Sequence, residues 1–135
     1  MQRLLIIHTP DPELKAIAEA IKKGAESQGL RVDLKNTKDR GTGVSFYPYD
    51  LILAGSSVSG IFKAKLDNSL ASFLADAKRT TGTDAVAFVK PHFFVTNKAL
   101  KKVMAALEAQ GCIVKNFKAL KNQDSAFKFG ENINI

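Results

Sequence analysis

The chain has 135 residues, enough for a single domain with a hydrophobic core. Its formal net charge is +7, and its 45% hydrophobic content is typical of a globular protein. A single cysteine excludes an internal disulfide and a multi-cysteine metal site. The first apolar run is too short for a signal peptide or a membrane span, so we expect a cytoplasmic protein.

The positive charge is unevenly distributed. Residues 71–135 hold ten of the 20 basic residues but only five of the 13 acidic ones. A basic half can attract an acidic protein, acidic lipid or nucleic acid. The lysines are dispersed and no arginine cluster is present, so nucleic acid is not the favoured partner and a solvated lysine-rich surface is expected.

The first third of the chain predicts a strand, a helix and an outer strand. Leu4–Ile7 is a continuous apolar run, as in a strand buried on both faces. A helix follows, with Asp11 as its N-cap, Pro12 at its first position and Gly29 at its end. Arg31–Lys35 alternates between polar and apolar residues, as in an outer strand.

The middle of the chain contains a long polar connection and two further elements. Residues 36–49, which include Gly41, lack helical periodicity, so no full helix is expected between the second and third strands. Asp50–Ala54 predicts a buried strand, and a loop of small residues, Gly55–Gly60, follows it. Apolar residues then recur at helical spacing and predict a helix from Phe62 to Ala77.

The last part predicts a strand, a loop, a helix, a strand and a tail. Ala85–Val89 predicts the fourth strand, and Lys90–Thr96 forms a loop. A helix from Asn97 to Gln110, capped by Thr96 or Asn97 and ended by Gly111, leads to a strand at Cys112–Phe117. The remainder, residues 118–135, is predicted to be a polar C-terminal tail.

Strands that alternate with helices predict an α/β fold with a parallel sheet covered on both faces, in one domain of residues 1–135. Ligands bind such sheets at the carboxyl ends of the strands. Three predicted loops meet at that edge, together with both histidines, His8 and His92. These loops are Thr9–Glu13, Gly55–Gly60 and Lys90–Thr96.

The first of these loops gives conflicting indications. A strand that leads directly into a helix N-terminus is a common phosphate site, and Thr9 offers a hydroxyl. The loop also contains two prolines, which lack an N–H, and two carboxylates, Asp11 and Glu13. The alternatives are a phosphate cradle around Thr9 and a capped helix start, of which the second is the favoured interpretation.

The other two loops offer further candidate contacts. Hydroxyls, a flexible glycine and a lysine in the second loop are either ligand contacts or parts of a capped turn; they are Ser56, Ser57, Ser59, Gly60 and Lys63. In the third loop, one of Phe93 and Phe94 is expected in the core and the other is a candidate stacking residue.

The two histidines receive different interpretations. His92 either bonds a ligand or is simply solvated, and His8 is expected to be structural. The sequence shows no catalytic set and no metal-ligand spacing, so we predict an electron carrier or binding module instead of a catalyst.

The segment from Tyr49 to Ser57, YDLILAGSS, with Gly60 and the later pair Phe73-Leu74, resembles the third strand and flavin-side loop of the flavodoxins, especially those of the protoporphyrinogen-oxidase type. The order of elements is similar from about Arg3 to Phe117. The resemblance implies a flavodoxin-like three-layer α/β/α sandwich with a five-stranded parallel sheet in the order 2-1-3-4-5.

The resemblance also implies a cofactor and a role. Flavodoxins bind FMN and carry electrons between redox partners, so FMN binding and an acidic redox partner are expected. Thr9, Ser56, Ser57, Ser59, Gly60, His92 and Phe93 would then line the pocket. The alternative is a flavodoxin-fold module that has lost FMN and acts as a binding or regulatory protein, because the first loop has no glycine and the second has Val58 where the family commonly has an aromatic.

Overall fold

The computed structural model describes residues 2–39 and 43–135 and contains a five-stranded parallel sheet. The strands are β1 (Arg3–His8), β2 (Arg31–Asn36), β3 (Leu51–Gly55), β6 (Asp84–Val89) and β7 (Ile113–Ala119). Their order across the sheet is β2-β1-β3-β6-β7, and every neighbouring pair is parallel. The predicted order of five strands, 2-1-3-4-5, is therefore confirmed.

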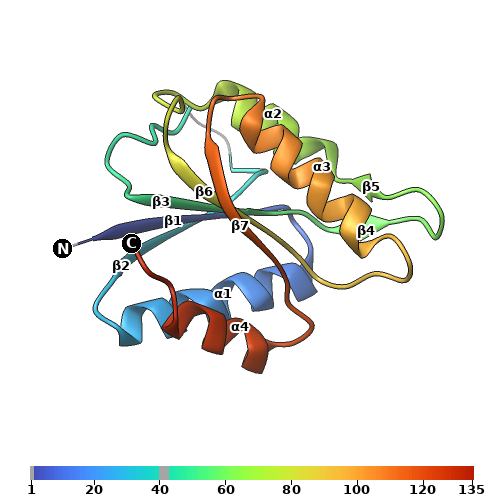
Figure 1. The fold of residues 1–135 in the computed structure, drawn as a ribbon, viewed down its shortest axis with the longest axis horizontal. Helices are drawn as coiled ribbons and strands as arrows, with labels where there is room; N and C mark the ends of the chain where they lie inside the picture. Colours follow the sequence, from blue (N-terminus) through green and yellow to red (C-terminus); the bar gives the residue numbers. More distant parts are fainter. Residues whose placement is uncertain (1, 40–42) are drawn as a thin grey trace.

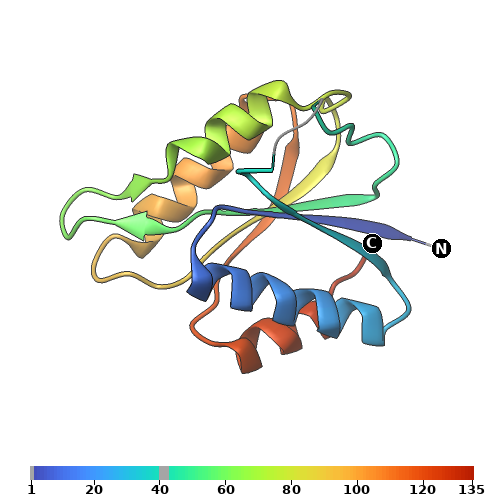
Figure 2. The ribbon, with the colours of Figure 1, turned by 180° about the vertical axis from the view of Figure 1, so that it is seen from behind.

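Two helices cover each face of this sheet, which confirms the three-layer α/β/α sandwich (Figures 1 and 2). One face carries α1 (Pro12–Ser27) and α4 (Gln123–Glu131), and the other carries α2 (Asn68–Asp76) and α3 (Thr96–Glu108). Between β2 and β3, residues 36–39 and 43–50 contain no helix, as predicted. Gly41 lies outside the described residues.

The central strands explain why the apolar runs in the sequence are continuous. Leu4 and Ile6 of β1 pack in the core beneath α1 and α4, whereas Leu5 and Ile7 pack in the core beneath α2 and α3. Neighbouring residues of a strand point to opposite faces, so a strand covered on both sides needs an apolar residue at every position.

The start of α1 follows the predicted capping chemistry. The Asp11 carboxylate accepts a hydrogen bond from the Leu14 amide at 2.9 Å, and Pro12 occupies the first helical position. Gly29, with φ of 86°, follows the end of the helix. The side chain of Asp11 therefore stabilises the turn between β1 and α1.

The helix predicted from Phe62 is wrong in its first part. Residues after β3 form an antiparallel hairpin, β4 (Val58–Ser59) and β5 (Lys65–Leu66), and α2 begins only at Asn68. The Asp67 carboxylate caps α2 by accepting from the Ser69 amide at 2.8 Å. A side-chain cap at this position fixes the helix start, so Phe62 and Leu66 share helical spacing without lying in a helix.

The predicted cap of α3 is also wrong. Its N-cap residue is Val95, which makes no side-chain cap hydrogen bond. The Thr96 hydroxyl instead accepts from the His92 amide at 3.0 Å, which stabilises the loop before the helix. Gly111, with φ of 83°, follows the helix as predicted.

Residues 118–135, predicted as a polar C-terminal tail, instead hold the end of β7 and the helix α4, which complete the sandwich. Lys118 and Ala119 belong to β7, and α4 follows with a capping box formed by Asn122 and Ser125. The two helices α1 and α4 cross at a pair of glycines: a Cβ on Gly24 would lie 2.1 Å from the Phe127 carbonyl oxygen, and one on Gly130 would lie 2.2 Å from that of Ile21. Only glycine, which has no Cβ, allows the backbones of the two helices to approach this closely.

This crossing gives a prediction for Gly24→Ala. Alanine normally stabilises a helix relative to glycine, by about 1 kcal/mol. Here the added methyl group clashes with the α4 backbone, so we expect the free energy of unfolding to fall by about 1–3 kcal/mol. Urea denaturation measures the effect, with Lys23→Ala on the exposed face of the same helix as control. An increase in stability for Gly24→Ala would contradict the close packing of α1 on α4.

Candidate functional site

A small cavity lies at the carboxyl edge of the sheet, where the three loops meet. Its volume is about 210 Å³. The first loop contributes Asp11 and Glu13, the second Ser56 and Ser57, and the third Lys90 and His92. The structure therefore brings three of the predicted site residues, Ser56, Ser57 and His92, to one cavity. Ligand pockets usually have volumes of ~300–1,000 Å³, so this cavity is smaller than a typical preformed site.

Thr9 is buried beside Ser57, and its hydroxyl is used within the protein. It accepts a hydrogen bond from the Ser57 amide at 2.8 Å and donates to the Ser57 hydroxyl at 3.4 Å. These bonds join the exit of β1 to the exit of β3. The Thr9 side chain therefore holds the second loop in position through these hydrogen bonds.

Ser56 has a similar structural role at the base of the hairpin. Its buried hydroxyl donates to the Ser57 carbonyl at 2.8 Å and accepts from the Asp67 amide at 3.1 Å. Hydrogen bonds from Ser69 hold the pKa of Asp67 below its usual value, so this carboxylate stays charged. The two ends of the hairpin are therefore linked before α2 begins.

Ser59 and Gly60 are exposed on the hairpin and are not among the residues that line the cavity. Gly60 has φ of 91°, and a Cβ there would lie 2.2 Å from the Lys63 carbonyl oxygen. The glycine is thus required by the tight turn that begins the hairpin tip.

The first and third loops are joined by an ion pair between Glu13 and Lys90. Lys90 is the only cationic side chain among the residues that line the described cavity, and Asp11 and Glu13 contribute two carboxylates. The fixed charges around the cavity therefore sum to one negative charge. An anion in the cavity would meet net repulsion.

The third loop presents both phenylalanines to solvent, so the prediction that one of them lies in the core is wrong. Phe93 is 68% exposed and Phe94 is 85% exposed, whereas Val95 is buried and fills the core position. A turn closed by the Val95 amide and the His92 carbonyl, at 3.2 Å, directs the chain in this way. Phe93 has φ of 47°, which is uncommon for a residue other than glycine and is often found at functional sites.

The ring of His92 packs edge-on against that of Phe93, with centroids 4.8 Å apart. The predicted candidates of the third loop are therefore in direct contact with each other. His8, by contrast, is buried, and its Nδ1 lies 2.9 Å from the Thr9 carbonyl oxygen, which agrees with the predicted structural role.

Phe62, at the tip of the hairpin, is a candidate that the sequence interpretation missed. It is 79% exposed, next to the half-exposed Ile61. Lys98 on the first turn of α3 donates to the Phe62 carbonyl at 3.4 Å, and Lys102 donates to the Ala64 carbonyl. The hairpin tip thus lies beside the start of α3, directly after the loop that carries Phe93 and Phe94, and both project from the same end of the molecule (Figures 1 and 2).

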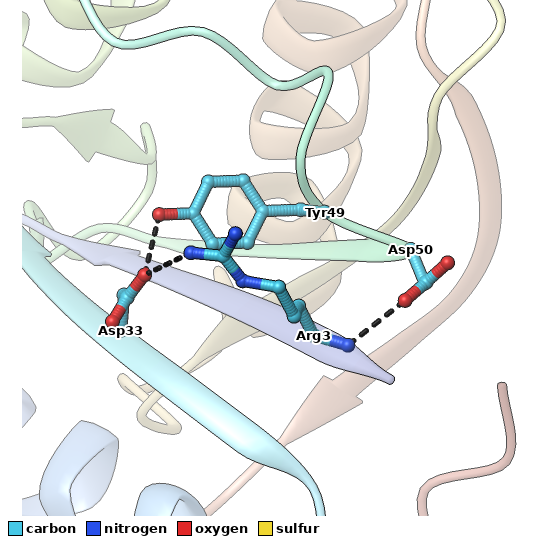
Figure 3. A network of polar contacts seen from close by, with 4 residues as sticks. All are labelled: Arg3, Asp33, Tyr49 and Asp50. Carbon is cyan, nitrogen blue, oxygen red and sulfur yellow. Dashed lines mark hydrogen bonds and ion pairs between the residues drawn. The ribbon is translucent and has the colours of Figure 1, made fainter. Parts of the chain in front are cut away.

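A second polar cluster lies at the opposite, amino edge of the sheet (Figure 3). The Asp33 carboxylate accepts from the Tyr49 hydroxyl at 2.6 Å and from Arg3 at 3.3 Å. The Arg3 amide donates to Asp50 at 2.8 Å. These bonds join the starts of three neighbouring strands, and we interpret them as structural.

The described part of the chain does not support metal binding or a reactive thiol. Residues 2–39 and 43–135 hold no cluster of three metal-ligating side chains. Burial raises the pKa of the Cys112 thiol, which is the direction of an unreactive cysteine. Among the same residues, no helix has the length and apolar character needed to span a membrane.

Comparison with solved structures identifies the architecture. Oxidised flavodoxin 1 from Bacillus cereus superimposes with a TM-score of 0.72 and 16% identity, over 96% of this chain and 95% of that one. This chain has the flavodoxin fold. Two-electron reduced flavodoxin from Megasphaera elsdenii matches with a TM-score of 0.65 and 17% identity, over 95% of this chain and 96% of that one.

The same fold also matches part of a larger protein. The flavodiiron protein from Giardia intestinalis has a TM-score of 0.67 and 17% identity, over 97% of this chain but 34% of that chain. No protein-family model matches the sequence, and no curated protein matches it. The predicted resemblance to flavodoxins is therefore confirmed at the level of the fold.

The amino-edge cluster gives a prediction for the titration of Tyr49. Burial and the hydrogen bond to Asp33 raise its pKa from 10.0 to about 12. A group with a raised pKa in the folded state stabilises fully below its unfolded pKa, so the free energy of unfolding should decline from about pH 10 to pH 12. Tyr49→Phe should remove that decline and the phenolate absorbance transition near pH 12. A transition near pH 12 that survives in the variant would contradict the assignment.

Proposed function

We propose that this flavodoxin-fold protein binds a flavin ring at the carboxyl edge of its sheet and acts in electron transfer. The observation that carries the proposal is the exposure of Phe62 and Phe94 on the two loops that flank the cavity. The third loop also carries Phe93, which is exposed as well. Large exposed apolar side chains that gather at one place commonly indicate a binding site.

The aromatic side chains suit the ring of a flavin. A planar aromatic ligand gains from offset or edge-on contacts with such residues, each worth about 0.5–1.5 kcal/mol beyond the area that it buries. Ser57 and His92 line the cavity, where His92 also contacts Phe93, and both offer hydrogen bonds to the polar edge of the ring. Thr9 and Ser56 act indirectly, because their hydroxyls hold Ser57 and the hairpin in place.

The two halves of FMN fit this site unequally. The isoalloxazine half matches exposed aromatics and neutral hydrogen-bonding groups. The phosphate half meets the carboxylates of Asp11 and Glu13 and a Thr9 hydroxyl that is already bonded. A flavin supplies one- or two-electron transfer when it is bound. The protein would hold the ring, shield one side of it from water and present the other to a partner.

The surroundings of the phenylalanines suit an acidic redox partner. Exposed lysines lie on the hairpin and on the first turns of α3: Lys63, Lys65, Lys98 and Lys102. Complementary charge around an apolar contact steers association and makes its rate depend on salt. We expect the association rate with an acidic electron-transfer protein to fall as ionic strength rises. A rate that is constant or that rises with salt would contradict this choice of partner.

The test of the flavin site is a titration of FMN with the apo-protein, followed by flavin fluorescence and the visible spectrum. Saturable quenching with a shifted spectrum is expected. Phe62→Ala should weaken binding about 3- to 10-fold, the range that corresponds to one aromatic contact. Because Phe62 is 79% exposed, its removal should leave the melting temperature nearly unchanged.

Phe117→Ala is the matched control for this titration. Phe117 is about half exposed on β7, the edge strand of the sheet, and belongs neither to the hairpin nor to the third loop. Its variant should bind FMN as the wild type does. Equal affinity of the wild type and Phe62→Ala would exclude the hairpin tip from the site. Absence of any saturable binding would favour the alternative of a flavodoxin-fold module without a flavin.

A further inference from the structure

We propose that the site selects an unphosphorylated flavin, and that riboflavin binds more tightly than FMN. The inference rests on the proposed function and concerns the first loop, between β1 and α1. In this loop the groups that would have to bind a phosphate are already occupied or carry the wrong charge.

The backbone donors of the first loop are used within the protein. The Thr9 amide donates to the Gly55 carbonyl at 3.3 Å, the Asp11 amide to the Thr9 carbonyl at 2.9 Å, and the Leu14 amide to the Asp11 carboxylate at 2.9 Å. Pro10 and Pro12 have no amide N–H to donate. From Thr9 to Leu14, only the amide of Glu13 is not among these donors. One amide cannot surround a phosphate.

The side chains of the loop add to this effect. The Thr9 hydroxyl already interacts with both the amide and the hydroxyl of Ser57. The Asp11 carboxylate caps α1, and Glu13 stands in the first turn of the same helix. The positive end of the helix dipole, which binds phosphate in many proteins, is therefore already matched by negative side chains.

The cationic side chain that lines the cavity is also engaged. Lys90 reaches across from the third loop and pairs with Glu13. A phosphate that approached Lys90 would also meet the Glu13 carboxylate, which lines the same small cavity and already shares the charge of this lysine. The aromatic side chains on the other two loops carry no such penalty. The site therefore favours binding of the flavin ring and disfavours binding of the phosphate group of FMN.

The experiment compares riboflavin and FMN in parallel titrations of the wild-type apo-protein at low ionic strength. We expect riboflavin to bind about fivefold more tightly, which corresponds to one charge contact at the protein surface. This advantage should shrink at high salt, because screening weakens the repulsion of the phosphate. FMN binding as tight as that of riboflavin, or tighter, would overturn the inference and leave the proposed function standing. If neither ligand binds, both fail.

A charge variant tests the cause of the preference. Asp11→Ser keeps a residue that can cap α1, and Glu13→Gln keeps the size of the side chain while it releases Lys90. In the double variant the advantage of riboflavin should disappear or reverse. Glu19→Gln, the same change on the exposed face of α1, is the control and should keep the wild-type ratio. An unchanged ratio in the double variant would overturn the electrostatic explanation.

Inorganic phosphate provides an independent test that needs no flavin. A ligand that binds the folded state raises the melting temperature as its concentration increases. We expect sodium phosphate and sodium chloride, matched in ionic strength and pH, to give the same melting temperature. A specific increase with phosphate, absent in Thr9→Val, would show a phosphate site in the first loop and overturn the inference.

Discussion

The contact between Thr9 and Ser57 determines the shape of the candidate site. The Ser57 amide donates to the Thr9 hydroxyl at 2.8 Å and so joins the exits of β1 and β3, two central strands of the sheet. With the second loop held in this position, Ser56 can bond the Asp67 amide at the far end of the hairpin. A hydroxyl that could have faced a ligand instead fixes the loop that carries Ser57 and Phe62.

This arrangement divides the carboxyl edge into two unlike halves. The half next to α1 is polar and closed by its own bonds: the Asp11 cap, the Thr9 contacts and the pair between Glu13 and Lys90. The half next to α3 is apolar and open, with phenylalanines from two loops in solvent. A ligand at this edge would therefore meet a closed polar surface on one side and an open apolar surface on the other.

Much of the fold could be predicted from the sequence because the central strands are buried on both faces. Such strands leave continuous apolar runs, as at Leu4–Ile7 and Ala85–Val89, and the start of α1 carries the local signal of Asp11 followed by Pro12. These features depend on neighbouring residues. The position of α4 on α1 was not predicted, because it depends on the close approach of Gly24 to the Phe127 carbonyl and of Gly130 to the Ile21 carbonyl, between residues far apart in the sequence.

The candidate site was harder to predict for a related reason. Phe62 and Leu66 have helical spacing, but the hairpin forms because Ser56 and Asp67 bond across it. The cap at Asp67 was a local signal that could have shown where α2 begins. Whether Phe93, Phe94 or Val95 enters the core is decided by the turn at His92, and apolar character alone does not distinguish the three.

The central claim is that the open apolar half binds the flavin ring and that the closed polar half does not take part. The most direct test is to follow the backbone amide NMR shifts during a titration with riboflavin. The account predicts the largest shift changes at residues 57–64 and 90–95, with the amides of Thr9, Asp11 and Leu14 nearly unmoved. Changes concentrated in residues 9–15, with residues 57–64 and 90–95 unaffected, would contradict it.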